Sequence, residues 1–497
     1  MHLTKFIMQK SAAVLTLLVG FFTSVRAQFT IDYKPELQPK ENMQYFTPAG
    51  GNLYVGDCIP FAHNGTYYLY WLVDKGHHTS LNGLGGHQWV LSTTTDLKHW
   101  THHPVVLGID EDWEKSICTG SLVYADNKFY AFYATRLVKD GQTNEQLSYA
   151  VSDDGIHFKK QKPNPFFTAP PGYSGRDFRD PKVTVDPTGR FNLLISSKEI
   201  NAPIKGQDGC LVRITSADLK KWDVGSPVLT GQNSVPECPD YFQWNGWYYL
   251  VYSNHSDTYY VKSKSPYGPW QYPRYQALKE EMANVAKTAE FAHNRRIAAA
   301  WIPSRQDNKD NGREIFGGSA VFREVVQAED GTLGTRFPAE MIPATTEPLK
   351  LPVVLDVAGS SGKTGDILLK AINGLGAAHL NHVPANCRIT LEVIPQGDNE
   401  EYGLYLRADE KATNGYKLRF SANERTVSLG NTRIESVEGL AKNTTIDIIM
   451  QNDIIDVSIN GNRCIVNRMP EQKGDFLWLY AKQGTVTFKS VTIAPLK

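Results

Sequence analysis

The sequence has no excess of charge of either sign, since its 497 residues contain 52 basic and 52 acidic side chains. This balance excludes the basic surface that nucleic-acid-binding proteins need, and it leaves no polybasic segment for a membrane surface. The six cysteines include no CxxC pair, so their spacing argues against a structural zinc site. Helical periodicity is weak as well, which makes an all-β protein the expected fold class.

Long apolar runs are missing too, apart from one at residues 12–25. Lys5 and Lys10 precede this run, and the tripeptide at 25–27 is an acceptable cleavage site. The run is too short to span a bilayer. We therefore predict a secretory signal at residues 1–27 and a protein exported to the periplasm, the cell surface or the medium.

The first part of the chain repeats one unit, a strand followed by a polar turn and an aromatic-rich strand. Its polar turns fall at Asn64-Gly65, Asp126-Asn127, Thr188-Gly189, Asn245-Gly246 and Asn294-Arg295. A second landmark, an aromatic residue at the end of a polar turn, recurs at positions 100, 158, 222 and 270, with intervals of 58, 64 and 48 residues. A period of this size in an all-β chain predicts four-stranded propeller blades, five of them between about residues 45 and 340.

The pattern changes after residues 343–355, which are rich in Pro and Thr and have the composition of a linker. Beyond them, segments such as 387–394 alternate apolar and polar residues, which predicts a two-sheet β-sandwich. We therefore expect a propeller domain at 28–342 and a sandwich domain at 356–497. The sandwich holds no comparable group of acids, so its expected roles are packing against the propeller or weak sugar binding.

Three acids share one phase of the repeat. Seven or eight residues before each polar turn the chain has, in order, Asp57, Cys118, Asp180, Glu237 and Ala286. Equivalent positions of radially arranged blades face a common axis, so we expect Asp57, Asp180 and Glu237 to meet in one pocket. Clustered acids are costly, and their usual justification is function.

Such a group of acids suits the hydrolysis of a glycosidic bond, which needs one ionised carboxylate and one protonated carboxyl group. Different surroundings must separate the two pKa values. Arg179 provides a cation next to Asp180, and prolines on both sides stiffen the turn that carries Glu237. Taken alone, each acid has a structural explanation, because Asp-Pro is a common turn former.

The settings of the three acids resemble glycoside hydrolase family 32, which includes invertases, levanases, inulinases and fructan exohydrolases. The matching positions are Asp57 in blade one, Arg179-Asp180-Pro181 in blade three and Glu237-Cys238 in blade four. Further segments similar to the family are 92–107, 117–123, 317–341 and 455–469. The resemblance therefore covers almost the whole chain after the signal and implies a five-bladed β-propeller followed by a β-sandwich.

The resemblance also implies a retaining reaction on β-fructofuranosyl linkages of an oligo- or polysaccharide, without metal or cofactor. Asp57 would be the nucleophile, Glu237 the acid and base, and Asp180 the stabiliser of the transition state, with Arg179 ordering their charges. In a retaining enzyme the two reacting carboxyl groups lie about 5–5.5 Å apart.

The sequence departs from the family in the shell that holds the sugar. The family pattern Trp-Met-Asn-Asp-Pro-Asn-Gly aligns with residues 54–60, where only Asp57 is kept. Leu72 replaces a Gln, and the blade-five Tyr is absent from 285–288. Two alternatives stay open: a hydrolase of another furanoside or glycoside, as in family 43, and a sugar-binding protein that has lost catalysis.

Aromatic side chains are candidates for that shell. Trp71 and Trp301 end strands and could stack on a sugar, while Trp89 and Trp113 could form the rim of the pocket. Packing between blades is the alternative for each tryptophan. The histidines at 77, 78 and 87 match no usual metal-ligand spacing, so we expect a polar surface loop there.

The cysteines allow two expectations. Export permits disulfides, and Cys387 and Cys464 in the C-terminal part could pair. Cys58 and Cys238 each follow a candidate catalytic acid. Because cysteine is usually buried, we expect these two side chains in the wall of the pocket.

Overall fold

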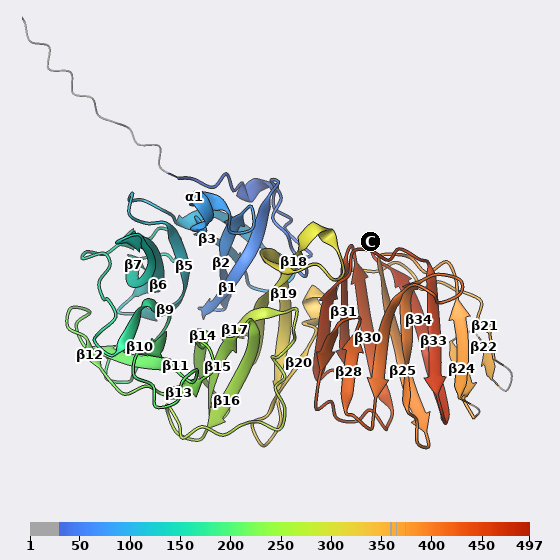
Figure 1. The fold of residues 1–497 in the computed structure, drawn as a ribbon. Coiled ribbons are helices and arrows are strands. Elements are labelled where there is room, and N and C mark those ends of the chain that lie inside the picture. Colours follow the sequence, from blue (N-terminus) through green and yellow to red (C-terminus); the bar gives the residue numbers. More distant parts are fainter. Residues whose placement is uncertain (1–28, 358–359, 364, 373) are drawn as a thin grey trace, which may run out of the picture.

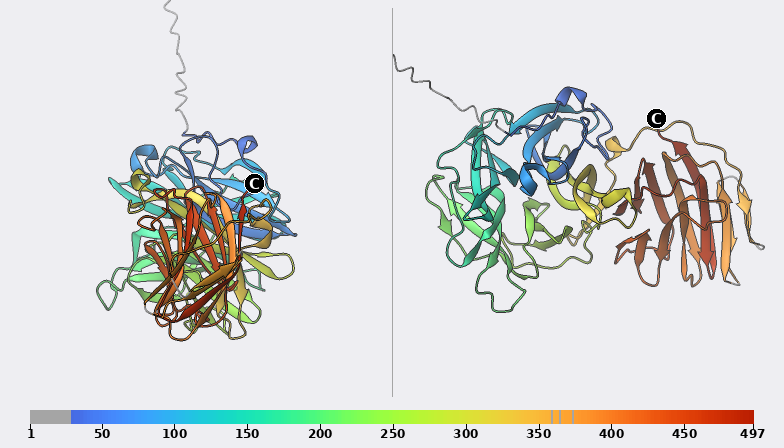
Figure 2. Two further views of the ribbon diagram at one scale, coloured as in Figure 1. Left: turned by 90° about the vertical axis from the view of Figure 1, so that its right-hand side faces the viewer. Right: turned by 45° about the horizontal axis from the view of Figure 1, so that its top comes forward.

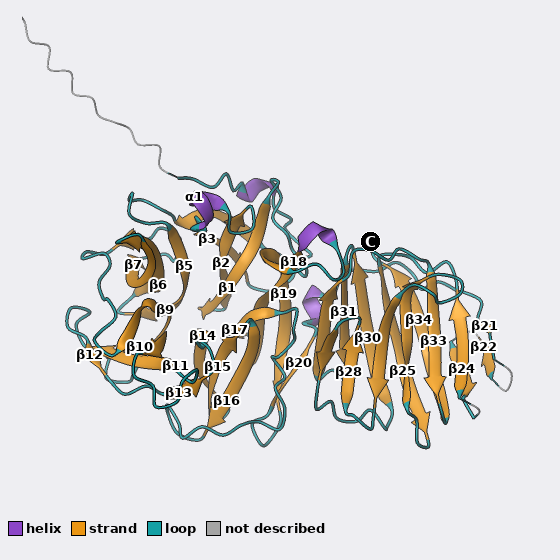
Figure 3. Ribbon diagram, in the orientation of Figure 1, coloured by secondary structure: helices purple, strands orange, loops and turns teal. Residues whose placement is uncertain are grey.

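Short strands joined by turns make up nearly all of the chain and form two adjoining domains, drawn in Figure 1 and coloured by element type in Figure 3. The computed structural model describes residues 29–357, 360–363, 365–372 and 374–497. The predicted export signal at 1–27 therefore lies outside the described residues. Within them, no helix combines the length and the apolar character that crossing a membrane requires.

The first domain is a propeller of five antiparallel blades (Figure 2). Blade one contains β1 (Leu53–His63), β2 (Thr66–Lys75), β3 (Gln88–Thr94) and β4 (Thr101–Leu107), and blade two contains β5 (Ser116–Ala125), β6 (Lys128–Lys139), β7 (Gln142–Ser152) and β8 (Lys159–Lys160). Blade three contains β9 (Tyr173–Val185), β10 (Phe191–Glu199), β11 (Gly209–Ser216), β12 (Asp223–Val224) and β13 (Leu229–Gln232). Blade four contains β14 (Glu237–Trp244), β15 (Trp247–Asn254) and β16 (Asp257–Ser263), and blade five contains β17 (Asn284–Phe291), β18 (Arg295–Arg305), β19 (Glu314–Gln327) and β20 (Leu333–Arg336).

The ring closes by strand pairing between its two ends. β19 of blade five pairs with β1 of blade one, with Val55 opposite Gly318, so these two blades share one continuous sheet. The helices within the described residues are all short: α1 (Ser80–Gly83), η1 (Pro35–Leu37), η2 (Gln306–Asn308) and η3 (Ala339–Met341).

The polar turns of the sequence repeat explain the tight hairpins inside the blades. Three of them join inner strands with both turn residues at positive φ: Asn64-Gly65 at 47° and 76°, Asp126-Asn127 at 47° and 60°, and Asn245-Gly246 at 46° and 76°. These dihedral angles are those of two-residue type I′ turns, which Asn, Asp and Gly favour because they tolerate positive φ. Local turn chemistry thus fixes the position of the first hairpin in these three blades.

The second domain is a β-sandwich of two seven-stranded sheets. One sheet orders its strands as β21 (Val354–Leu355), β24 (Leu375–Leu380), β33 (Phe476–Lys482), β26 (Glu401–Ala408), β27 (Tyr416–Ser421), β28 (Thr426–Leu429) and β29 (Thr432–Ile434). The other orders them as β22 (Ser361–Lys363), β23 (Asp366–Lys370), β34 (Thr485–Pro495), β25 (Cys387–Gln396), β30 (Thr444–Gln451), β31 (Ile454–Ile459) and β32 (Arg463–Arg468). The apolar residues that alternate along these strands pack face to face in one core that includes Leu404, Phe420, Ile448 and Phe488.

The boundary between the domains remains a prediction at 28–342, 343–355 and 356–497, with one observation on its detail. β21, at the end of the predicted linker, already pairs with β24 of the sandwich. A buried ion pair also fixes the two domains to each other, since Arg323 lies 2.8 Å from Glu280 of the propeller and 2.7 Å from Asp456 of the sandwich.

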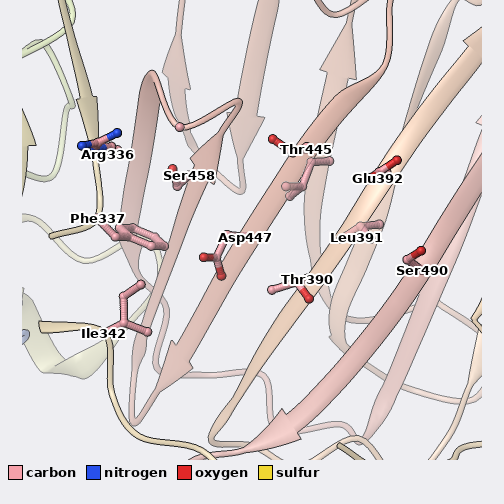
Figure 4. Close-up of a pocket in the computed structure, with 12 residues that line it drawn as sticks. Arg336, Phe337, Ile342, Thr390, Leu391, Glu392, Thr445, Asp447, Ser458 and Ser490 are labelled. Atoms are coloured by element: carbon pink, nitrogen blue, oxygen red, sulfur yellow. The ribbon is translucent and has the colours of Figure 1, made fainter. Parts of the chain in front are cut away.

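A hollow of about 420 Å³ lies beside this junction, between Arg336 and Phe337 on one side and the sandwich strands on the other (Figure 4). Two acidic residues, Glu392 and Asp447, line it, and Asp447 is paired with Arg388 at 2.7 Å. This hollow therefore lacks the group of unpaired acids that a glycosidase needs.

All six cysteines are buried and free, so the possible disulfide between Cys387 and Cys464 is wrong. The two residues lie on β25 and β32, which are three strands apart in one sheet. Three strand spacings amount to about 14 Å, whereas a disulfide needs Cα atoms within about 7 Å. Cys58 and Cys238 are both buried, as expected. The expected place in a pocket wall is wrong for Cys58, which packs in the hydrophobic core of blade one.

Candidate active site

A bulge interrupts the inner strand of every blade at the same point. Two residues of the inner strand there face a single residue of the next strand. The bulged pairs are Gly56-Asp57, Cys118-Thr119, Asp180-Pro181, Cys238-Pro239 and Val285-Ala286. Bulges redirect side chains and are frequent next to active sites. Here they turn one segment of each inner strand toward the axis of the ring.

The three acids occupy neighbouring positions of this bulge. Glu237 comes directly before the bulged pair, Asp180 is its first residue and Asp57 is its second. The sequence repeat therefore locates them to within two residues, but their phase is not identical. Asp180 has φ 55°, and Cys238 and Val285 at the same bulge position have φ 50° and 57°. Positive φ is costly for such residues, and this kind of strain concentrates at functional sites.

A cavity of about 370 Å³ opens at the axis and is lined by Asp57, Asp180 and Glu237 together. Arg179 and Trp301, two of the side chains predicted to bind the substrate, line it as well. The expectation that the acids of blades one, three and four meet in one pocket agrees with this arrangement.

Cys238 lies between two of the acids. Its backbone N–H donates to Asp180 Oδ2 at 3.0 Å. Its thiol lies 3.6 Å from Asp180 Oδ2 and 3.7 Å from Asp57 Oδ2. From the other side, the indole N–H of Trp301 donates to Asp57 Oδ1 at 3.1 Å. Both oxygens of Asp57 are thus held in place.

Arg179 connects the remaining acid to this group. Its Nη2 donates to Glu237 Oε1 at 3.0 Å, and its Nη1 donates to Asp177 Oδ1 at 2.6 Å. Its Nε lies 3.8 Å from Asp180 Oδ2, and Nη1 lies 3.4 Å from Glu145 Oε2. One guanidinium group therefore faces four carboxylates.

Burial raises the pKa of all three acids, and different cations oppose this rise. Burial raises the pKa of Asp180 to about 7, against the opposing effect of Arg179. Burial also raises the pKa of Glu237, with Arg179 opposing, and that of Asp57, with Lys287 opposing. A group of buried acids beside two separate cations can divide protonated and ionised roles among its members.

The structure corrects two of the predicted sugar-binding tryptophans. Trp71 has no exposed surface and packs against Tyr33 and Phe46 in the core of blade one. Trp89 has none either, and its indole N–H donates to the carbonyl of Cys118. Trp113 is half-buried outside the cavity lining, where its indole N–H donates to Glu111. Packing between strands and blades is therefore the role of Trp71 and Trp89.

The cavity is also lined by side chains that were not among the predicted site residues, namely His78, His87, Arg136, Glu145 and Asn284. The expected polar surface loop is wrong for His87, which is 2% exposed and lies 3.1 Å from the buried Asp74. Lys287, which is 3% exposed and follows the bulge of blade five, donates from Nζ to the carbonyl of Gly120. The repeat holds a signal for Asn284, because it precedes a bulge as Arg179 and Glu237 do.

Within the described ranges, no group of three or more His, Cys, Asp or Glu side chains is arranged to hold a metal ion. The family described as "Glycosyl hydrolases family 32 N-terminal domain" matches residues 58–331, more than half of the chain. The chain belongs to glycoside hydrolase family 32.

Individual family 32 relatives are distant. The chain is 23% identical to raffinose invertase of Escherichia coli over 470 residues, which cover 86% of this chain and 90% of that protein. It is 24% identical to sucrose-6-phosphate hydrolase of Escherichia coli over 294 residues, which cover 53% of this chain and 60% of that protein. With the sucrose-6-phosphate hydrolase of Bacillus subtilis the identity is 28%, over 44% of this chain and 46% of that one.

Solved structures of the family share the fold. Fructan 1-exohydrolase IIa of Cichorium intybus superposes with a TM-score of 0.65 at 16% identity, over 92% of this chain and 98% of that one. The exo-inulinase of Aspergillus awamori gives a TM-score of 0.65 at 16% identity, over 94% and 99% of the two chains. This family 32 chain is thus an all-β glycoside hydrolase with a propeller followed by a sandwich.

Proposed function

We propose that this enzyme hydrolyses β-fructofuranosyl linkages with retention of configuration, through a covalent intermediate on Asp57. The observation that carries the proposal is the shared cavity of Asp57, Asp180 and Glu237, bordered by Arg179. The names of the relatives support the sugar, since they include an invertase, a fructan exohydrolase and an exo-inulinase.

In the first step, an oxygen of Asp57 attacks the anomeric carbon while Glu237 gives its proton to the leaving oxygen. The glycosidic C–O bond breaks, and an ester bond forms between Asp57 and the sugar. In the second step, Glu237 takes a proton from water, and the resulting hydroxide displaces Asp57. The carboxylate of Asp57 and the protonated Glu237 are then restored.

Asp180 and Arg179 would contribute electrostatic stabilisation and would form no bond to the substrate. Positive charge develops on the sugar ring in the transition state, and an ionised Asp180 would stabilise it while accepting hydrogen bonds from sugar hydroxyls. Arg179 touches Glu237 and would help to return it to the ionised form needed before water attacks.

The cavity offers a partly new sugar shell. Trp301 borders it with its ring while its N–H holds Asp57, so it can pack against the sugar next to the nucleophile. Leu72 lines the cavity where the family has a glutamine. Thr119 and Asn284 each carry a buried side-chain oxygen without a protein partner, and a sugar hydroxyl would supply one.

We also propose that the carbohydrate is met outside the cytoplasm, because residues 1–27 have the pattern of an export signal. The sandwich would then support the propeller without taking part in catalysis. Mass spectrometry of the mature N-terminus after expression in the native host tests the cleavage near residue 27.

The function is tested by incubating the purified protein with sucrose, inulin, levan and arabinan and measuring released sugar. Release from sucrose or a fructan, abolished in both Asp57→Ala and Glu237→Ala, is the expected result. Release from arabinan alone would mean that the enzyme acts on another furanoside. Binding without turnover would make the protein a lectin-like relative and overturn the proposal. Proton NMR of the first product anomer checks the retention of configuration.

A further inference from the structure

A row of alternating charges leads from Glu237 into blade two. Glu237 accepts from Arg179 at 3.0 Å, and Arg179 lies 3.4 Å from Glu145. Glu145 in turn accepts from Arg136, whose Nη2 and Nε lie 2.8 Å and 3.1 Å from its Oε1. The row therefore crosses from β14 through β9 and β7 to β6 along one wall of the cavity.

Glu145 holds the two arginines apart. It is 6% exposed, and each of its carboxylate oxygens faces a different guanidinium group, Oε1 toward Arg136 and Oε2 toward Arg179. Arg136 also contacts two neutral groups, His78 Nε2 at 3.0 Å and the carbonyl of Leu84 at 3.1 Å. Burial lowers the pKa of His78 to about 4, so this ring adds no charge at neutral pH.

The same carboxylate restricts how Arg179 meets the general acid. Nη1 of Arg179 faces Asp177 and Glu145, while Nη2 faces Glu237. With Nη1 held by two acids, the guanidinium makes one contact with Glu237 instead of the two-pronged pair that arginine forms with an unrestrained carboxylate. A two-pronged pair would favour the ionised form of Glu237 more strongly.

We propose that Glu145 is a positioning residue for the reaction: it holds Arg179 between two blades so that Glu237 can keep the proton it must donate. This inference rests on the proposed function, which takes Glu237 as the general acid.

The charges around Glu237 agree in direction with this role. Burial raises the pKa of Glu237, Arg179 lowers it, and the negative charges of Asp57 and Glu145 raise it. Besides Glu145 and Glu237, the titratable or charged groups in or beside the cavity are Asp57 on β1, His78 and His87 before β3, Cys118 on β5, Arg136 on β6, Asp177, Arg179 and Asp180 on β9, Cys238 on β14, Lys287 on β17 and Glu314 on β19.

Two substitutions should move the general acid in opposite directions. Glu145→Gln keeps the size of the side chain but removes its negative charge. Arg179 then stabilises the ionised form of Glu237 more strongly, and the pKa of Glu237 falls. Arg136→Gln leaves Glu145 with Arg179 as its one cation, which weakens the contact of Arg179 with Glu237 and raises that pKa.

The measurement is kcat/KM against pH for wild type and both variants, with the sugar from the panel above that the wild type hydrolyses. Because Glu237 must be protonated to act, kcat/KM falls as pH rises through its pKa. We expect this basic limb to move down by about 0.5–1 pH unit in Glu145→Gln and up in Arg136→Gln, with kcat reduced about tenfold in Glu145→Gln. Glu145→Asp should recover part of the loss.

A superimposable basic limb in both variants would overturn the proposal, even where kcat falls. Glu111→Gln is a matched control, because Glu111 binds Trp113 and Lys162 outside the cavity and should leave the profile unchanged. If no sugar in the panel is hydrolysed, the proposed function fails separately. Carbon-13 NMR titration of the Glu237 carboxyl group then tests the same two opposite shifts without turnover, and equal titration curves would reject the inference.

Discussion

The indole N–H of Trp301 in blade five donates to Asp57 in blade one at 3.1 Å, across the seam that closes the propeller. This hydrogen bond favours the ionised carboxylate, and it opposes the burial that raises the pKa of Asp57. The two residues are 244 positions apart in the chain, so the last blade completes the surroundings of the proposed nucleophile.

Trp301→Phe keeps an aromatic ring at the cavity and removes the N–H donor. A hydrogen bond to a charged group contributes about 1.5–3 kcal/mol, so we expect kcat/KM to fall at least about tenfold. Steady-state kinetics on the established substrate measures this loss. Trp71→Phe is the control, since Trp71 is enclosed in the core, and it should lower Tm while leaving KM unchanged. Equal kinetic effects of both variants would contradict the assignment.

Asp180→Asn should stabilise the protein at alkaline pH. Burial raises the pKa of Asp180 to about 7, whereas an unfolded chain gives aspartate about 3.9. An acid whose pKa is higher in the folded than in the unfolded state contributes fully to the free energy of unfolding below pH 4. This contribution is lost as the pH rises to 7, because the buried carboxyl group must then ionise. The neutral amide avoids this cost, and asparagine tolerates the φ of 55° at this position.

We therefore expect the Tm of Asp180→Asn to exceed that of wild type by about 2 °C or more at pH 8 and to equal it near pH 4. Differential scanning calorimetry at the two pH values gives the comparison. Activity should fall at least about a hundredfold. A variant that is less stable than wild type at pH 8 would mean that the charge of Asp180 supports the fold.

Lys287→Met should shift the acidic limb of the pH profile. The buried ammonium group of Lys287 donates to the carbonyl of Gly120, and its charge lowers the pKa of Asp57. Because Asp57 must be ionised to attack in the proposed reaction, its pKa should set the rise of kcat/KM with pH. Removing the charge raises that pKa, so the acidic limb should move up by about 0.5 pH unit or more. An unchanged limb would assign Lys287 to the fold alone.

The thiols should be unreactive until the protein unfolds. All six cysteines are free and buried, and burial raises the pKa of the Cys238 thiol well above its usual value. Only a thiolate reacts readily with an alkylating reagent. We expect six thiols per chain in a colorimetric assay after denaturation without reductant, and fewer than one in the folded protein. A count of four thiols after denaturation would show that the protein contains one disulfide and would contradict this prediction.

Local chemistry made the blades and the sandwich predictable. Turn pairs such as Asn64-Gly65 hold the positive φ values that tight hairpins need, so each hairpin can be found from its own few residues. The distribution of Trp71 and Trp301 could not be found in this way. Both lie in apolar strands, but Trp301 is paired with Asn284 before the bulge, whereas Trp71 is paired with Cys58 after it. That offset places Trp301 at the cavity and Trp71 inside the blade.

The sequence also provided no basis for predicting the charged residues Glu145 and Arg136 in the cavity. Arg136 and Glu145 lie on β6 and β7, the two middle strands of blade two, and their proposed role depends on Arg179 from another blade. His87 belongs to a polar loop by composition, and its burial depends on the carboxylate of Asp74 from the preceding strand. Contacts between blades decide these positions, and no local pattern records them.

The pairing of β19 with β1 has a consequence for biosynthesis. A ribosome releases blade one long before blade five, so the nucleophile emerges without its indole donor and without the strand that completes its sheet. A partly made chain is therefore an incomplete catalyst, and hydrolysis begins only when the ring has closed. Truncation at residue 290 should accordingly give a product without activity, whereas the wild-type chain gains activity in step with ring closure during refolding.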